Sequence, residues 1–478
     1  MTGDPGALAK PLRIPGRPKP GVNLVGFLEA ESGLGEVARR LAAVFETTDI
    51  PLAPISYRGT LGRQRHPLEL SLADDAPYDT NVICLSADDL TTFAGEVGSD
   101  FFAKRYSIGV WFWETNVFSS PERSATMFLD ELWVASEYIS QAVVGEVDVP
   151  VHVVPVPAEP LAGPFRTRAE LELPERFTFL FVFDFWSGER KNPTAVVDAF
   201  TRAFAPGEGP ILVLKSINGR DWKPHQLDRL LALAGGREDI LLRDGYVSAE
   251  ERDSYVAACD CYVSLHRSEG LGLTMAEAMA CGKPVVATGY SGNLEFMSEE
   301  NSYLVPYRLV NVPDTWWAHA PGARWAEPDV DAAARCLRTV WERQDEARAI
   351  GLRAQREIVD RFKPERTREF VRDRLADARE RGAVRARGSE HDARPPILEA
   401  SRELAGEVGE GLARGGGSPP ASLVRRLLQR ALWPYLEEQR RFETSVLDAL
   451  VTLHRSVEDL ERRLAAVERP PDRERGEG

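Results

Sequence analysis

The sequence predicts an α/β protein in which two Rossmann-like domains face one cleft, followed by a helical extension. Short apolar segments that we interpret as buried strands alternate with segments of helical periodicity, which is typical of a parallel sheet covered on both faces. The alternation runs through residues 22–160 and begins again at residue 168, after a stretch that contains Pro160, Gly163 and Pro164. Ligands of such sheets bind at the carboxyl ends of the strands, so we expect the site between the two domains.

Composition narrows the class of protein. The chain has 478 residues, a formal net charge of −15 and five cysteines. The length allows two or three domains with large cores. The negative charge argues against a nucleic-acid partner, because phosphate contacts need a basic face. The cysteines form no CxxC pair, and no apolar run approaches the ~20 residues of a membrane span. We therefore expect a cytoplasmic enzyme with free thiols.

The first domain is predicted to follow a disordered lead. Residues 1–21 contain five prolines and few apolar residues. The domain itself, residues 22–160, opens with an apolar strand and a loop that contains Gly33 and Gly35. A helix with regularly spaced apolar residues follows this loop. The loop either borders a ligand or is a tight turn without one, and the residues leave both interpretations open.

The second domain, residues 168–350, repeats the pattern and contains the most informative stretch of the chain. There we predict a strand at 261–265, a glycine-containing loop at 268–272 and a helix at 274–281. Backbone N–H groups at the start of such a helix face an anion, usually a phosphate. This stretch is therefore a candidate phosphate site.

Two glutamates flank the start of this helix, Glu269 in the loop and Glu277 in the helix. A carboxylate accepts hydrogen bonds from two hydroxyl groups at once, which suits the vicinal diols of a sugar or a ribose. A phosphate site between two such carboxylates fits a nucleotide sugar. The alternative is local: Thr274 and Glu277 have the spacing of a capping box, and Glu269 would then be a solvated loop residue.

The residues from Glu269 to Thr288, EGLGLTMAEAMACGKPVVAT, resemble the signature of the family-four retaining glycosyltransferases, which have the GT-B fold. A weaker resemblance extends from about residue 22 to residue 370. It implies that Glu269 contacts the transferred sugar and that Glu277 contacts the ribose of the nucleotide. It also implies that the donor diphosphate binds between them, at the backbone of Gly270, Gly272, Leu273 and Thr274.

The resemblance also assigns cations to the donor site. Lys191 matches a lysine that binds the diphosphate in the family. Phe185 stands where the family has an arginine, so that role passes to Arg190, Arg267 or Lys215. A leaving diphosphate gains negative charge, which explains why the site needs such cations. Each of them is otherwise a solvated surface residue.

Three further loops are assigned less directly. In the resembled family, the first loop of the N-terminal domain, which here contains Gly33 and Gly35, borders the donor sugar and the acceptor. Many members of the resembled family have a sugar-binding histidine near Trp113, but this chain has none there, and Glu114 is the candidate replacement. We interpret Trp111 as a core residue and place Trp113 at the cleft. Gly292 and Asn293 follow the strand after the signature, where the family has residues close to the donor.

The predicted function is the transfer of a hexose with retention of configuration. The donor is GDP-mannose or a UDP-sugar, and the acceptor is a glycan or glycolipid in cell-envelope polysaccharide biosynthesis. No cluster of residues has the spacing of metal ligands, and the resembled family works without a bound metal, so we expect neither a metal nor a cofactor. The alternatives are a nucleotide-sugar epimerase, a glycogen-type polymerase, and a non-catalytic scaffold of a polysaccharide assembly complex.

The C-terminal part is predicted to contain crossover helices at 351–380, a flexible linker at 381–420 and amphipathic helices at 421–468. Apolar residues from Val446 to Val467 have the heptad spacing of a coiled coil. We expect this helix to bind a second copy of itself or another protein of envelope biosynthesis. Packing on the chain's own catalytic domains, or contact with the inner face of the plasma membrane through basic residues, are the alternatives.

Overall fold

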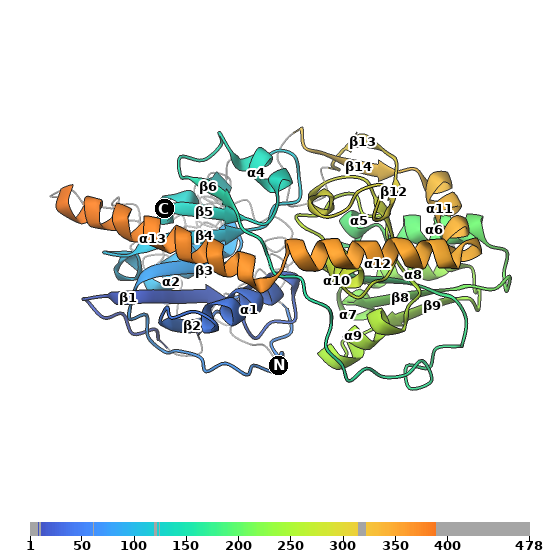
Figure 1. Cartoon of the computed structure of the whole chain (residues 1–478), viewed down its shortest axis with the longest axis horizontal. Helices are drawn as coiled ribbons and strands as arrows, with labels where there is room; N and C mark the ends of the chain where they lie inside the picture. Colours follow the sequence, from blue (N-terminus) through green and yellow to red (C-terminus); the bar gives the residue numbers. More distant parts are fainter. Residues whose placement is uncertain are drawn as a thin grey trace, which may run out of the picture. The chain divides into compact units, whose positions relative to one another are not determined.

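The computed structural model describes residues 8, 11–60, 62–118, 122–123, 125–313 and 322–388. They form two six-stranded parallel sheets with helices packed on them (Figure 1). The predicted α/β architecture with two Rossmann-like domains is therefore confirmed. The amphipathic helices predicted at 421–468, and the linker predicted at 381–420 beyond residue 388, lie outside the described residues.

The first domain is built on a sheet with the strand order β2-β1-β3-β4-β5-β6. Its strands are β1 (Lys19–Gly26), β2 (Leu52–Ser56), β3 (Tyr78–Cys84), β4 (Tyr106–Trp111), β5 (Glu131–Val134) and β6 (Val151–Val153). The helices are α1 (Gly33–Glu46), α2 (Ala87–Val97) and α4 (Glu137–Val143), with 3-10 turns η1 (Ser99–Phe101) and η2 (Ala125–Phe128). Parallel register places Val25 between Ile55 and Ile83, so the carboxyl ends of these strands share one edge.

The second domain has the strand order β12-β11-β10-β7-β8-β9. Its strands are β7 (Thr178–Asp184), β8 (Ile211–Ile217), β9 (Ile240–Asp244), β10 (Cys261–Ser264), β11 (Val285–Thr288) and β12 (Tyr303–Val305). Its helices are α5 (Gly188–Lys191), α6 (Pro193–Ala203), α7 (Gly219–Trp222), α8 (Pro224–Ala234), α9 (Ala249–Ala258) and α10 (Leu273–Ala280), with 3-10 turns η3 (Phe185–Ser187) and η4 (Gly292–Glu295). An antiparallel hairpin of β13 (Tyr307–Asn311) and β14 (Arg324–Pro328) follows β12.

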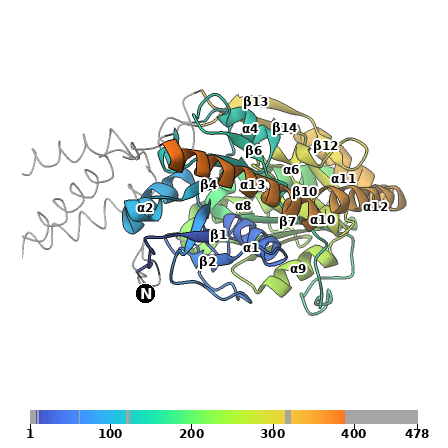
Figure 2. The same ribbon diagram turned by 60° about the vertical axis from the view of Figure 1, so that its left-hand side comes forward.

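Three helices complete the described chain: α11 (Val330–Glu342), α12 (Gln344–Arg361) and α13 (Pro364–Gly388). Helix α12 packs against α10 of the second domain, and α13 packs against α1 of the first (Figures 1 and 2). Gly351 permits the first of these contacts, because a Cβ atom there would lie 2.3 Å from the carbonyl oxygen of Gly282. The helices thus cross from one domain to the other, as the sequence predicts for 351–380, although α12 already begins at Gln344.

Helix α13 is fixed to the first domain by a buried ion pair. Glu131, at the start of β5, is fully buried and accepts hydrogen bonds from Arg374 of α13 at 2.8 and 2.7 Å, one to each carboxylate oxygen. Trp133 and Tyr106 donate to the same carboxylate at 2.7 and 3.0 Å. Burial by itself would raise the pKa of Glu131, but the hydrogen bonds from Arg374 and Trp133 and the charge of Arg374 lower it.

Two predicted boundaries need correction. The disordered lead was expected to end at residue 21, yet Arg13 pairs with Asp74 and β1 begins at Lys19. This segment is ordered by backbone hydrogen bonds of Arg13 with Asp74 and Ala76, and by a hydrogen bond from Arg105 to the carbonyl of Pro15. A low apolar content does not exclude such contacts. The linker predicted from residue 381 also begins too early, because α13 continues to Gly388.

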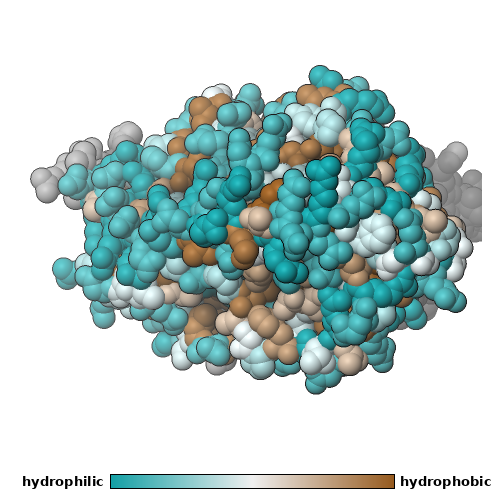
Figure 3. All heavy atoms as spheres, turned by 45° about the vertical axis from the view of Figure 1, so that its right-hand side comes forward, coloured by the Kyte–Doolittle hydropathy of each residue, from teal (hydrophilic) through white to brown (hydrophobic). Residues whose placement is uncertain are grey.

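The visible surface is mostly polar. Figure 3 shows one face of the molecule, on which hydrophilic side chains predominate. Within the described part of the chain, no helix is long and apolar enough to cross a membrane.

Replacing Arg374 by methionine should strongly destabilise the protein, because the buried Glu131 carboxylate would lose its charged partner. Such one-sided removal typically costs about 3–5 kcal/mol. The measurement is the urea midpoint of unfolding at pH 7. Arg372→Met is the matched control, since Arg372 pairs with Asp49 at the surface, where an ion pair contributes little to stability. Equal effects of the two substitutions would contradict the anchoring role of Arg374.

Candidate active site

Four of the predicted catalytic residues come together at the carboxyl ends of the strands. Glu269 lies in the loop between β10 and α10, and Arg190 and Lys191 lie in the short helix α5 after β7. Strands β7 and β10 are neighbours in the sheet, so these two segments meet at one edge. Glu114 comes from the first domain, in the loop after β4.

Glu269 is the centre of this cluster, and its side chain is only 8% exposed. Oε1 lies 2.5 Å from Nζ of Lys191, and Oε2 lies 3.2 Å from Nη1 of Arg190. The contact of Oε1 with Lys191 is an ion pair and not an aligned hydrogen bond. Burial alone would raise the pKa of Glu269, but the charges of Lys191 and Arg190 outweigh it and lower the pKa to about 2. The carboxylate is therefore ionised at neutral pH.

Arg190 connects this carboxylate to the first domain. Its guanidinium is buried, donates to the carbonyl of Ser268 at 2.9 Å and lies 3.5 Å from Oε1 of Glu114. Burial tends to lower the pKa of Arg190, but the charges of Glu269 and Glu114 raise it. Glu114, the predicted replacement of the family's histidine, thus places its carboxylate next to the guanidinium of Arg190.

Glu277 is engaged across the domains in a way that the sequence did not predict. It is buried in α10 and forms a close ion pair with Arg40 of α1. Arg40 also contacts Glu36 at 2.8 Å and donates to the carbonyl of Pro157 at 2.7 Å. Arg40 was missed because, in the sequence, it is one of several arginines on an amphipathic helix. The capping-box alternative is wrong: the N-cap of α10 is Gly272, and no side chain caps this helix.

The glycines and Asn293 have different structural roles. Gly272 has φ +92°, a backbone conformation that favours glycine, and it starts α10. A Cβ atom on Gly292 would lie 2.0 Å from the carbonyl oxygen of Gly270, so Gly292 allows two loops to touch. Asn293 is fully buried between the carbonyl of Thr288 and His266. The first N–H groups of α10, at Leu273 and Thr274, have no side-chain cap, which leaves them suited to an anion.

In the first domain, the two loop glycines also differ. A Cβ atom on Gly35 would lie 2.6 Å from the carbonyl oxygen of Phe27, whereas Gly33 faces open space. Gly35 therefore has a packing reason of its own, and the structure gives the ligand interpretation of this loop no further support.

Two predicted cleft residues are directed elsewhere. Lys215 is buried, and its ammonium donates to the backbone carbonyls of Ser216, Arg243 and Gly245. Burial lowers its pKa to about 8. Trp113 is buried like Trp111, packs on Phe118 and donates to the carbonyl of Val117 at 2.9 Å. Placing Trp113 in the cleft and Lys215 on a ligand is therefore not supported, because internal partners use both polar groups.

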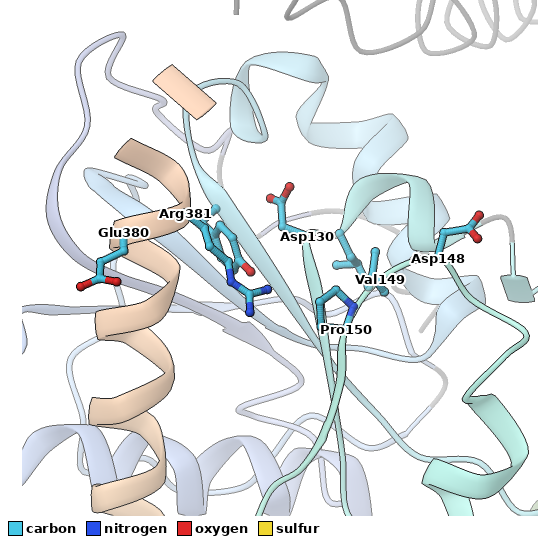
Figure 4. A pocket seen from close by; sticks show the side chains of 8 residues that line it. Asp130, Asp148, Val149, Pro150, Glu380 and Arg381 are labelled. Atoms are coloured by element: carbon cyan, nitrogen blue, oxygen red, sulfur yellow. The ribbon is translucent and has the colours of Figure 1, made fainter. Parts of the chain in front are cut away.

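One hollow on the surface of the first domain lies away from this cluster. A cavity of about 600 Å³ lies at the amino-terminal edge of the first sheet, next to the end of α13 (Figure 4). Its lining includes Asp130, Asp148, Glu380 and Arg381. None of the predicted site residues is among its lining residues. In the described residues, no group of three or more His, Cys, Asp or Glu side chains is arranged to hold a metal ion.

Comparisons with known proteins agree with this architecture. HepE of Anabaena, in complex with UDP and glucose, is 15% identical with a TM-score of 0.52; the similarity covers 75% of this chain and all of that one. Sucrose-phosphate synthase of Thermosynechococcus elongatus is 16% identical with a TM-score of 0.54, at the same coverage of 75% and 100%. The described chain therefore has the GT-B fold of glycosyltransferases.

Sequence matches with known proteins cover part of the chain. Residues 176–313 match the family Glycosyl transferases group 1. The D-inositol 3-phosphate glycosyltransferase of Xylanimonas cellulosilytica is 34% identical over 102 residues, 21% of this chain and 24% of that protein. The enzyme of the same name from Arthrobacter sp. strain FB24 is 32% identical over 131 residues, 27% of this chain and 30% of that protein. These matches span less than a third of either relative, and they support the family resemblance inferred from the signature.

The ionised state of Glu269 predicts a specific pH dependence of stability. Its pKa in the folded protein, about 2, lies below the ordinary value of 4.5, so its stabilising contribution is complete above about pH 5 and is lost as the pH falls toward 2. The difference in thermal midpoint between the wild type and Glu269→Gln should therefore shrink between pH 5 and pH 3. Glu299→Gln, at an exposed position, is the control and should show no such trend. A constant difference for Glu269→Gln would show that this carboxylate is not held ionised.

Proposed function

We propose that this protein is a retaining glycosyltransferase that uses a nucleotide diphosphate sugar. The observation that supports this most is the Glu269 cluster. A buried carboxylate, the two cations of helix α5 and the uncapped start of α10 lie together, and Glu277 is in α10 as well. These groups supply what a sugar, a diphosphate and a ribose each require: an acceptor for hydroxyl groups, positive charge, and a second acceptor.

The chemistry follows from where charge develops. The bond between the anomeric carbon and the phosphate oxygen breaks, and negative charge grows on the departing diphosphate. Lys191, Arg190 and the N–H groups at the start of α10 would stabilise that charge. The acceptor hydroxyl oxygen bonds to the anomeric carbon on the same face, and its proton passes to the departing phosphate oxygen. Glu269 holds sugar hydroxyls and orients the donor, so no covalent enzyme intermediate is needed.

The comparisons suggest the donors to test first. HepE forms a complex with UDP and glucose, and the two curated relatives are by name glycosyltransferases of D-inositol 3-phosphate. We therefore propose a UDP-hexose, with GDP-mannose as the next candidate, and a glycan or glycolipid acceptor of the cell envelope. The reaction takes place without a metal or a cofactor, on the cytoplasmic side of the membrane.

One observation favours a second candidate, a non-catalytic scaffold. Both carboxylates that should receive the donor are engaged by protein cations, Glu269 by Lys191 and Arg190, and Glu277 by Arg40. In an enzyme, the ribose must replace or join Arg40 at Glu277. In a scaffold, the ion pair would simply hold the two domains together.

A nucleotide panel separates these candidates. UDP, GDP, ADP and TDP, each with its sugars, should be tested by thermal shift on the wild type and on Glu277→Gln. A ligand at 100 times its Kd stabilises the folded state by about 2.7 kcal/mol, which is readily measured. We expect one nucleotide to shift the wild type and the exposed-site control Glu299→Gln, but not Glu277→Gln.

If no nucleotide or nucleotide sugar shifts the wild type, the scaffold is favoured. If Glu277→Gln binds as well as the wild type does, Glu277 is not the ribose contact, and the proposed arrangement of the donor is wrong.

Removing the charge of Lys191 should slow transfer from the donor that the panel identifies. Lys191→Met is expected to lower kcat by about 10²-fold, the size of effect seen when one group that stabilises developing charge is removed. The measurement is release of the nucleoside diphosphate. Lys363→Met is the matched control, because Lys363 is half-exposed between α12 and α13 and pairs with Asp360 of α12. Unchanged kcat in Lys191→Met would remove this residue from the site.

A further inference from the structure

The hairpin β13–β14 lies directly against the loops that carry the Glu269 cluster. It follows β12 at the edge of the second sheet (Figure 1), and its two strands pair from Tyr307 with Pro328 to Asn311 with Arg324. The backbone N–H of Ala326 in β14 donates to the carbonyl of Arg267 at 2.9 Å. The hairpin is thus joined by hydrogen bonding to the chain just two residues before Glu269.

Arg267 connects the hairpin to α5. Its side chain pairs with Glu327 of β14 at 2.8 Å, lies over the ring of Trp325 at 5.6 Å and donates to the carbonyl of Glu189. Its backbone N–H donates to the carbonyl of Arg190 at 2.7 Å. Arg267 therefore links β14 to two backbone carbonyls of α5, those of Glu189 and Arg190. The proposed use of Arg267 as a phosphate cation is not supported, because its guanidinium is engaged in these contacts.

The hairpin also reaches the first domain. Trp325, Val312 and Ala323 form a small buried cluster, and Val117 of the loop after β4 packs against it. The backbone N–H of Arg324 donates to Oδ1 of Asn116 at 2.7 Å. This loop carries Glu114, which contacts Arg190. The hairpin therefore touches the supports of all four charged residues in the cluster.

We propose that β13–β14 is a positioning element for the active site and that Arg267 and Trp325 are its positioning residues. The planar guanidinium of Arg267 makes several directed contacts at once, which fixes α5 relative to the Glu269 loop. Trp325 holds the Glu114 loop from the other side. The chemical role of the cluster rests on the proposed function, whereas the mechanical coupling does not depend on it.

Amide hydrogen exchange of the full chain tests the coupling without any substrate. Glu327→Gln and Arg267→Lys should speed exchange about tenfold in residues 188–192, where the N–H of Asn192 donates to the carbonyl of Gly188 at 2.8 Å. Trp325→Phe should have the same effect in residues 112–118. Arg202→Lys, which alters surface ion pairs of the same domain, should change neither segment. Wild-type exchange in both segments, in variants with the wild-type thermal midpoint, would overturn the proposal.

A kinetic measurement distinguishes positioning from general destabilisation. With the donor found in the nucleotide panel, Glu327→Gln should lower kcat about tenfold while the KM for the donor changes less than twofold, because Glu277 and α10 are untouched. A KM change without a kcat change would show that the hairpin acts on binding and would contradict the proposal. If the wild type binds none of the nucleotides or nucleotide sugars in the panel, the proposed function fails, and the exchange experiment still decides whether the hairpin holds the cluster.

Discussion

The structure depends on keeping a buried carboxylate ionised. Glu269 is buried, and removal of its carboxylate from water alone favours the neutral form. Lys191 and Arg190 reverse this, but Arg190 is itself buried and needs Glu114 and the carbonyl of Ser268. Each buried charge is stable only because an opposite charge lies beside it. Small displacements of the loops would leave a buried charge without its partner, so the loops must be held firmly.

Both domains hold the loops of the Glu269 cluster in place. At the start of α4, Ser136 donates to the carbonyl of Gly270 at 2.6 Å, and the N–H of Glu137 donates to Glu295 at 2.6 Å. On the other side of Glu269, Arg40 of the first domain binds Glu277. Contacts from the first domain therefore bracket the signature segment of the second. Helices α12 and α13 also join the two domains, through contacts with α10 and α1.

The residues that the sequence predicted well are those whose chemistry follows from local pattern. A glycine loop after a strand and before a helix identifies a site edge, so Glu269 and Lys191 could be proposed from spacing and resemblance, and the structure brings them into contact. The residues that it missed act over long separations: Arg40 pairs with Glu277, 237 residues away, and Arg374 pairs with Glu131, 243 residues away. No periodicity in a helix shows which of its arginines faces a distant carboxylate. The surroundings of Lys215 could not be predicted for the same reason, since only the fold shows that backbone carbonyls surround its ammonium.

The sequence by itself determined the alternating strands and helices, the two sheets and the glycine loop before α10, because apolar periodicity and backbone freedom are local properties of the chain. Only the tertiary structure decided the charge state of Glu269, the ion pair between Glu277 and Arg40, and the attachment of the β13–β14 hairpin through Arg267. Those outcomes depend on burial and on distances between groups far apart in the sequence. Electrostatic energy in a protein is set by such distances and by exclusion of water, and neither is defined until the chain has folded.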